Sequence, residues 1–393
     1  MNFLRKQIDK IKPKFEKGSK FYFLHSTVDA FETFLYVPDK VTTKGSHIRD
    51  AIDMKRTMII VVLALIPCLL FGMYNTGLQH FIATGQEQSF WPMFWYGFLK
   101  VLPLLIVTYV VGLSIEFTFA QIRHHDVNEG FLVTGMLIPL IVPIDIPLWM
   151  LALATAFAVI LGKEVFGGTG MNFLNPALTA RIFLFLAYPS LMTGDKVWIS
   201  GLIKGENIVD GFSGETLLGQ VANGSSVLVD GFGEKINIID MIVGTIPGSV
   251  GETSVIAILI GAVVLLVTGI GSWRIMLSVV LGGSIMGLIF NAINMNPAME
   301  IPWYEHLILG GFLFGTVFMA TDPVTATQTN KGKYIYGFLI GVLAILIRVA
   351  NPGYPEGMML AILLMNVFAP LIDHMIVQSN IKKRQKRTVA VKS

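Results

Sequence analysis

Cysteine is almost absent from this sequence. The single thiol belongs to Cys68, which lies inside a long apolar run. One cysteine cannot close a disulfide within the chain, and it cannot hold an iron–sulfur cluster, which normally takes four cysteine ligands. We therefore expect Cys68 to be a small residue of the packed interior.

Charged residues are also scarce, at 14% of the 393 residues, against about 25% in a typical soluble domain. Hydrophobic residues make up 53%, and the mean hydropathy is +0.67. The apolar runs are long and do not alternate with polar residues, which favours helices over a membrane barrel. The basic start of the chain lacks the apolar stretch of a cleavable signal peptide. The sequence therefore predicts an all-α polytopic membrane protein.

About ten transmembrane helices are predicted from the apolar runs. The third predicted span contains Pro139, Pro143 and Pro147, and a proline inside a helix removes a backbone hydrogen bond. We therefore expect this span to be kinked or discontinuous. The predicted spans cover residues 56–74, 95–119, 130–146, 148–166, 172–188, 254–270, 273–292, 306–320, 334–350 and 357–376.

Lysine and arginine are concentrated in residues 1–55 and in the tail, 378–393. Because basic segments favour the cytoplasmic side, both ends are predicted to be cytoplasmic, which an even number of spans permits. Five predicted helices then occupy residues 56–188 and five occupy residues 254–377. The connection between them, 189–253, is predicted to be a periplasmic loop, in agreement with its few basic residues.

The two groups of helices share a sequence pattern. The third span begins EGFLVTGMLIP and the eighth begins GGFLFGTVFMA. Each is followed by a break, another apolar span and a turn rich in glycine, asparagine and proline. Because five spans separate equivalent elements, the two groups are predicted to form an inverted 5+5 repeat. Inverted repeats with broken helices form the midplane pathway of many transporters.

An acid lies at the cytoplasmic end of the eighth predicted span. Asp322 occurs in FMATDPVTATQ, among several threonines. An acid at membrane depth points to function, and carboxylate and hydroxyl oxygens suit a hard cation such as sodium. Alternatively, Asp322 caps a half-helix by accepting from free N–H groups. Phe314 and Phe318 share a helix face just before it, so they either form a hydrophobic gate or pack in the interior.

Two arginines lie inside predicted spans. Arg181 belongs to the fifth span and Arg348 to the ninth, at roughly corresponding places in the two groups. A guanidinium is too costly to leave unpaired in lipid. We expect both to be paired within the protein, either in a structural role or along an ion pathway.

A polar segment, RHHDVNEG, lies on the predicted cytoplasmic side. Histidines in this position would suit proton delivery to a quinone during its reduction, although a solvated loop has the same composition. Two adjacent histidines face different ways on a helix, so we expect no metal site here. The candidate quinone-site residues are His124, His125, Asp126 and Glu129.

The predicted periplasmic loop contains VDGF twice, at 209–212 and 229–232. The first copy continues SGET, which gives Ser213 and Thr216 small neighbours and accessible hydroxyls. The second copy continues GEK and offers no hydroxyl. The loop has no catalytic triad or His/Cys metal cluster, and GGTG at 167–170 lacks the GK[ST] ending of a P-loop. These residues alone do not assign a reaction to Thr216, and an ordinary turn is the alternative.

Taken together, the motifs resemble one family of membrane proteins. HHDVNEGF, GKEVFGGTGMNFLNPAL, DGFSGET, FMATDPV with NKGK, and IRVANPGYPEGMMLAILLMN are similar to segments of the B subunits (NqrB) of the sodium-translocating NADH:quinone reductases (Nqr). The resemblance covers essentially the whole chain. It implies a urea-transporter-like inverted repeat of ten helices in a bacterial inner membrane.

In this family, the threonine that closes a D-x-x-[S/T]-G-A-T motif carries FMN through a phosphoester bond, which a flavin transferase forms from FAD. Thr216 occupies that position, and Asp210, Ser213 and Gly214 match the motif. Glu215 stands where alanine is usual and adds a charge beside the acceptor. The resemblance thus implies that Thr216 carries covalent FMN.

The resemblance also implies a non-covalent riboflavin, with Asn172 and Asn175 as candidate contacts. Electrons would arrive from a second covalent FMN on a neighbouring protein of the complex and pass through both flavins to ubiquinone or menaquinone, near the cytoplasmic side. The region of Phe314, Phe318 and Asp322 matches the proposed sodium path. The implied partners are the other Nqr proteins (NqrA, NqrC, NqrD, NqrE and NqrF), the flavin transferase and the lipid bilayer, with no nucleic acid.

Other functions share part of this pattern. The RnfD protein of an Rnf complex, an ion-pumping ferredoxin:NAD oxidoreductase, has the same flavin motif but usually lacks a basic segment such as residues 1–55. A urea-transporter-like channel would have the inverted repeat but no use for DGFSGET. A structural scaffold would leave all cofactors to its partners.

Overall fold

The structure is a computed structural model. It describes residues 54–392 except 124–129, 195, 204, 206 and 207, and before residue 54 only scattered positions, among them a short 3-10 helix at Lys12–Phe15. The candidate quinone-site residues lie outside the described part, so their role stays a prediction: His124, His125, Asp126 and Glu129.

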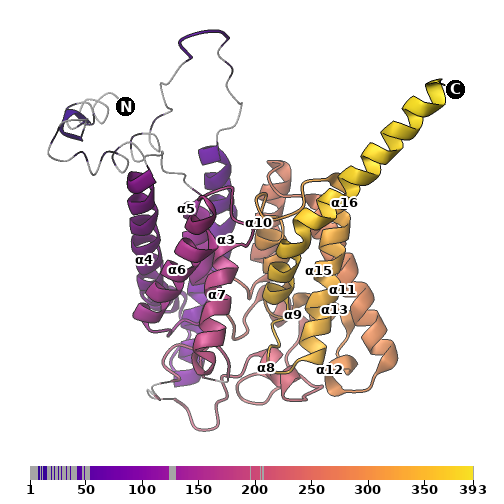
Figure 1. Ribbon diagram of the computed structural model, residues 1–393. Coiled ribbons are helices and arrows are strands. Elements are labelled where there is room, and N and C mark those ends of the chain that lie inside the picture. Colours follow the sequence, from indigo (N-terminus) through magenta and orange to yellow (C-terminus); the bar gives the residue numbers. More distant parts are fainter. Residues whose placement is uncertain are drawn as a thin grey trace.

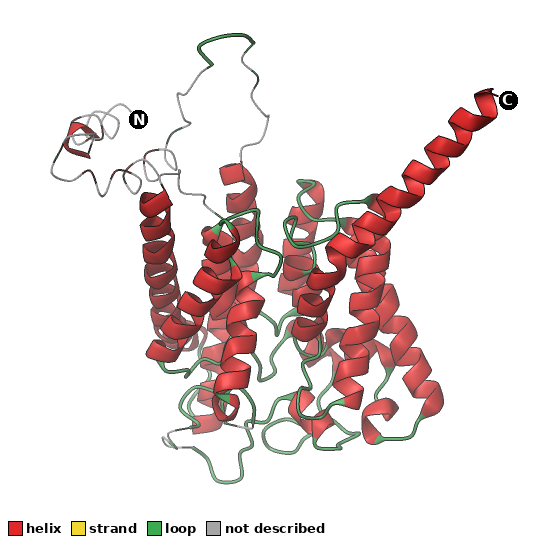
Figure 2. Cartoon of the chain, in the orientation of Figure 1, coloured by secondary structure: helices red, strands yellow, loops and turns green. Residues whose placement is uncertain are grey.

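Helices form nearly all of the regular structure (Figure 2). The described residues contain no β-strand, only an isolated bridge between Val229 and Lys235. Six helices are long and apolar enough to cross a membrane, which indicates a multi-pass membrane protein. They are α3 (Met54–Thr84), α4 (Phe90–Arg123), α6 (Leu148–Gly162, extended by a 3-10 turn to Phe166), α11 (Trp273–Ile293), α15 (Asn330–Ala350) and α16 (Met358–Lys392).

Shorter helices complete the bundle and its connections. Three of them are apolar: α5 (Phe131–Ile141), α7 (Pro176–Ala187) and α10 (Val255–Val267). The others are α8 (Leu217–Ala222), α9 (Ile238–Val243), α12 (Pro297–Glu300), α13 (Trp303–Ile308) and α14 (Phe312–Phe314), which continues as a π-helical turn, Gly315–Met319.

The long helices run side by side (Figure 1), with the start of α3 and the outer end of α16 at one end of the bundle and α8 at the opposite end. Helices from the two halves of the chain meet, because α10 packs on α3 and α16 packs on α7. Helix α10 is apolar on its outer face too, where Ile256, Leu259 and Val263 are exposed. A helix that is apolar all round suits lipid. Cys68 is buried, as predicted.

The third predicted span is broken, as its prolines indicate. Helix α5 ends at Ile141, and Val142 is extended, with φ −102° and ψ 158°. Pro147 then precedes the first residue of α6. A chain segment without helical hydrogen bonds inside a membrane has to lie against protein, and Val142, Ile144 and Ile146 of this segment are buried.

The prediction of one continuous eighth span over residues 306–320 is wrong. Helix α13 ends at Ile308, and Gly310 has a φ of +63°, a left-handed conformation that favours glycine. Helical structure resumes only at Phe312. The backbone turns between the two helices, so the apolar run is divided between two elements.

Arg348 holds this break in place. Its guanidinium, on α15, donates to the carbonyl oxygens of His306 and Leu309, the second at 3.1 Å, and its Nε donates to Pro355 at 3.2 Å. Carbonyls at a helix end have no partner within the helix, and Arg348 supplies one. The expected pairing of Arg348 is therefore confirmed, with backbone carbonyls as the partners.

Candidate functional site

A cavity of about 480 Å³ lies beside α8. Segments far apart in the sequence line it: α7, the start of α8, the loop before α10, and the turns at 309–310 and 352–356. Its volume is in the range of cofactor and ligand sites. The aromatic side chains in its wall are Phe185, Trp198 and Tyr354, and its charged side chains are Arg181, Glu215, Glu252 and Glu356.

Thr216 lies in the wall of this cavity and begins helix α8. Its Oγ1 accepts a hydrogen bond from the backbone N–H of Gly219 at 3.1 Å, which is the usual role of threonine at a helix N-cap. The side chain is half-buried, and Ser213 also lines the cavity. The hydroxyl singled out in the sequence therefore faces a space large enough for a cofactor.

The second VDGF supports the first. The N–H of Ser213 donates to the carbonyl of Gly231 at 2.8 Å, and the rings of Phe212 and Phe232 pack edge to face with centroids 5.2 Å apart. The side-chain amide of Gln220, on α8, exchanges two hydrogen bonds with the backbone of Val229 at 2.7 and 2.9 Å. The duplicated sequence thus fixes the loop that carries Thr216.

The remaining motif residues have different surroundings. Asp210 is exposed and Gly214 is buried, and neither lines the cavity. The carboxylate of Glu215 accepts a hydrogen bond from the side chain of Asn223, just beyond α8. Glu215 is therefore held along the short helix, beside Thr216 and facing the same cavity.

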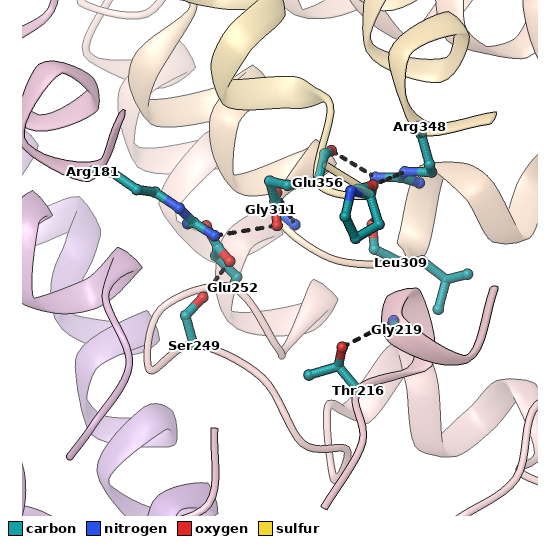
Figure 3. A network of polar contacts seen from close by, with 10 residues as sticks. Arg181, Thr216, Gly219, Ser249, Glu252, Leu309, Gly311, Arg348 and Glu356 are labelled. Carbon is teal, nitrogen blue, oxygen red and sulfur yellow. Dashed lines mark hydrogen bonds and ion pairs between the residues drawn. The ribbon is translucent and has the colours of Figure 1, made fainter. Parts of the chain in front are cut away.

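A buried ion-pair cluster forms another part of the cavity wall (Figure 3). The guanidinium of Arg181 donates to Glu252 at 2.7 Å and to Glu356 at 3.3 Å. The Ser249 hydroxyl donates to Glu252, and the N–H of Gly311 donates to Glu356 at 3.0 Å. Arg181 and Glu252 are 4% and 5% exposed. The expected pairing of Arg181 is confirmed.

Helix α3 positions the loop that carries Glu252. The side-chain amide of Asn75 donates to the carbonyl of Ile246 at 2.9 Å, and that of Gln79 donates to Thr245 at 3.1 Å. Both amides are buried, where an unpaired polar group is costly. The wall of the cavity is therefore tied to a long helix of the first half of the chain.

A second, smaller cavity of about 80 Å³ lies next to Asp322. Its lining includes Asn172, Asn175, Phe318 and Asp322, so the structure brings the two candidate riboflavin contacts together with two residues of the predicted ion path. Asn175 caps α7 through its Oδ1, and its Nδ2 donates to Asp322 at 3.2 Å. This contact joins the two halves of the chain.

Asp322 is satisfied by groups of the protein. Besides Asn175, it accepts from the Val324 N–H at 3.0 Å and the Thr325 hydroxyl at 3.1 Å. Phe314 and Phe318 are both buried, with ring centroids 5.0 Å apart, and belong to the main hydrophobic core. Their packing in the interior is thereby confirmed, and a gating role stays a prediction.

The sequence profile described as the NQR2, RnfD, RnfE family matches residues 41–382. The chain belongs to this family. Similar proteins include the B subunit of the Na(+)-translocating NADH-quinone reductase of Ectopseudomonas mendocina, 49% identical over 98% of this chain and 100% of the relative. The protein of the same name in Chromohalobacter salexigens is 48% identical over 98% and 97% of the two chains, and that of Azotobacter vinelandii is 47% identical over 98% and 100%.

The sequence motifs identified Thr216 and Arg181 as residues of interest. They did not identify Glu252 and Glu356, which lie beside Arg181 in the cavity wall. Glu252 and Glu356 are 71 and 175 residues from Arg181, and no periodicity links positions so far apart. One signal was present, because each acid follows a glycine- or proline-rich turn just before an apolar run. An arginine inside a predicted span demands such a partner.

Proposed function

We propose that this chain is the membrane-embedded NqrB protein of a sodium-translocating NADH:quinone reductase, and that it carries FMN on Thr216 with the flavin ring in the 480 Å³ cavity. The observation that carries this proposal is the position of the Thr216 hydroxyl in the wall of that cavity. The relatives support it by name and match nearly from end to end, which favours the Nqr type over the Rnf alternative.

The cavity fits such a group in size and chemistry. Phe185, Trp198 and Tyr354 provide apolar surface for an aromatic ring system, and the Tyr354 hydroxyl is buried without a hydrogen-bond partner among the described residues. Bound there, the flavin supplies electron-transfer chemistry that no side chain provides. The protein orients the group through Thr216 and limits its contact with water.

The attachment chemistry also suits Thr216. A flavin transferase would join the phosphorus of the FMN moiety to Thr216 Oγ1, displace AMP from FAD and release the hydroxyl proton. In the N-cap contact Oγ1 accepts the hydrogen bond, so the hydroxyl proton is not engaged in it. Glu215 adds negative charge beside this atom, and its contact with Asn223 holds that charge along α8.

The other expectations form part of the same proposal. Riboflavin would be held on the Asn172 and Asn175 side of the bundle, quinone would bind near residues 124–129, and sodium would pass near Asp322. The ends of the chain would be cytoplasmic and the Thr216 loop periplasmic. The opposite positions of α8 and the outer end of α16 support this sidedness (Figure 1).

Covalent flavin on Thr216 is expected to survive denaturation and to disappear when the hydroxyl is removed. The protein is produced with its flavin transferase, separated in a denaturing gel and inspected for flavin fluorescence. The adduct is then mapped by mass spectrometry. We expect it on Thr216, with residues 229–235 bare, because the second VDGF copy has no hydroxyl.

Two variants separate attachment from folding. Thr216→Asn keeps a good N-cap acceptor for α8 but forms no phosphoester, so it should fold and lose all fluorescence. Thr216→Ser keeps the hydroxyl and the cap and should retain flavin. A fluorescent Thr216→Asn band, or wild-type protein free of flavin after maturation, would show that the proposal is wrong.

Asp322→Ala is expected to raise the sodium concentration needed for half-maximal quinone reduction by about 10–100-fold. This range corresponds to the loss of one charged ligand, about 1.5–3 kcal/mol. The measurement is the sodium dependence of quinone reduction by the assembled complex. Glu300→Gln, which changes an exposed acid outside both cavities, is the control. Unchanged sodium dependence in Asp322→Ala would remove this residue from the ion path.

A further inference from the structure

The cluster beside Thr216 has one positive charge too few. Arg181 lies between the carboxylates of Glu252 and Glu356, so the fully ionised cluster has a net charge of −1. Arg181 and Glu252 are almost completely buried, and the side chain of Glu356 is 13% exposed. Among the described residues that line the cavity, Arg181 is also the only cation, whereas Glu215 adds a further acid.

An uncompensated charge in a buried site is costly, because each ion has lost its water and one guanidinium cannot neutralise two carboxylates. When two carboxylates share one site, protonation of one of them relieves the repulsion. Glu252, in the loop between α9 and α10, shows this effect. Burial raises its pKa, Arg181 opposes the shift, and Glu356 adds to it. The Ser249 hydroxyl also faces this carboxylate.

A second, independent feature, Tyr354, belongs to the same wall of the cavity. Tyr354 is 6% exposed, and its hydroxyl has no hydrogen-bond partner among the described residues. Its ring is fixed by an edge-to-face contact with Phe185, with centroids 4.5 Å apart. Burial raises the pKa of the Tyr354 hydroxyl, Arg181 opposes the shift, and Glu356 and Glu252 add to it. A buried hydroxyl without a partner is rare unless a ligand or water completes it.

We propose that Glu252 and Glu356 together hold one exchangeable proton, and that the Tyr354 hydroxyl connects this proton to the group bound in the cavity. This inference rests on the proposed flavin at Thr216. When the bound group gains an electron, the Tyr354 hydroxyl passes its proton to that group and takes up the proton of the carboxyl pair, so the cluster changes from neutral to −1. The proton returns when that electron is passed on. The electrons come from NADH through the complex, so the cluster exchanges a proton only.

Infrared difference spectroscopy on the assembled complex tests this exchange, because a protonated carboxyl has its own C=O band. The difference between oxidised and reduced complex should contain such a band with a sign that shows deprotonation on reduction. Glu252→Gln should remove it. Glu356→Gln provides a second variant, and it should remove or shift the same band. Glu300→Gln, which changes an exposed acid outside both cavities, should leave it unchanged.

Tyr354→Phe tests the connection. The hydroxyl makes no hydrogen bond to the described protein, so folding and flavin content should be preserved. In time-resolved spectra the carboxyl band should appear at least about tenfold more slowly, since a positioned proton donor typically contributes about 10²–10⁴ in rate. An unchanged rate would overturn the role of Tyr354.

Failure of this inference can be told apart from failure of the flavin assignment. In the flavin-free Thr216→Asn chain, a spectrum of the difference between acid and alkaline pH should still show the shared proton, lost in Glu252→Gln. Absence of that band overturns the shared proton whether or not flavin is present. In a complex that carries flavin, the other adverse result is a carboxyl band that is present in the acid-minus-alkaline spectrum and absent from the oxidised-minus-reduced spectrum. That result overturns the coupling between the shared proton and the charge of the bound group.

Discussion

Replacing Arg181 with leucine is expected to lower the free energy of unfolding by about 3–5 kcal/mol. The substitution leaves the carboxylates of Glu252 and Glu356 buried without their cation. Glu252 then keeps the hydrogen bond from Ser249, and Glu356 keeps the one from Gly311. Unfolding of the purified protein in detergent, followed by circular dichroism against denaturant, measures the change. Flavin content should fall as well, because Arg181 joins α7 to the loops before α10 and α16.

A charge-balanced triple variant is the control for this prediction. Arg181→Leu combined with Glu252→Gln and Glu356→Gln removes all three charges and keeps the volume of the acids. It should recover a large part of the lost stability, because replacement of a whole buried ion pair is often neutral. Arg181→Lys should be intermediate, since one ammonium does not match the two-pronged geometry of a guanidinium. Equal losses in the single and triple variants would contradict this account.

The helical membrane character of the fold and the break in the third span were predictable from the sequence. Scarce charge and long apolar runs predicted the helical membrane bundle, and three prolines predicted a break in the third span, which the structure has after Ile141. The eighth span was wrong because hydropathy measures how apolar a run is and does not measure backbone direction. Gly310 turns the chain inside an apolar run, and the partner that stabilises this turn, Arg348, comes from another helix.

Part of the candidate site was also predictable from the sequence, and part of it depends on packing between distant segments. Thr216 was found because its motif is local, and Asn175 and Asp322 were singled out separately for reasons unrelated to their contact. Their hydrogen bond spans 147 residues, and only the packing of the two halves creates it. The role of the second VDGF copy as a support for the first was also beyond the sequence, which showed only that the copy lacks a hydroxyl.

One added methyl group on α3, in Gly72→Ala, is expected to disturb the cavity at Thr216. A Cβ at this position would lie 1.9 Å from the carbonyl oxygen of Val250 and 2.6 Å from its Cγ1. The nearest atom belongs to the backbone, so no change of rotamer relieves the clash. Either α3 or the loop that carries Glu252 has to move. We expect a loss of about 1–3 kcal/mol in the free energy of unfolding, together with reduced flavin attachment to Thr216.

The matched control is Gly162→Ala, a second glycine within a helix. Its Cβ would meet nothing closer than the Thr179 side chain at 3.5 Å, an ordinary contact. Both substitutions favour helix, by up to about 1 kcal/mol, so a general propensity effect would raise the stability of both variants. Gly72 lies inside α3 and Gly162 is the last residue of α6, so propensity should favour Gly72→Ala at least as much, and the Val250 clash acts against it. If Gly72→Ala matched Gly162→Ala in stability and flavin content, the loop before α10 would not depend on the close contact between Gly72 and Val250. The hydrogen bonds of Asn75 and Gln79 would then be the contacts from α3 that hold the cavity wall.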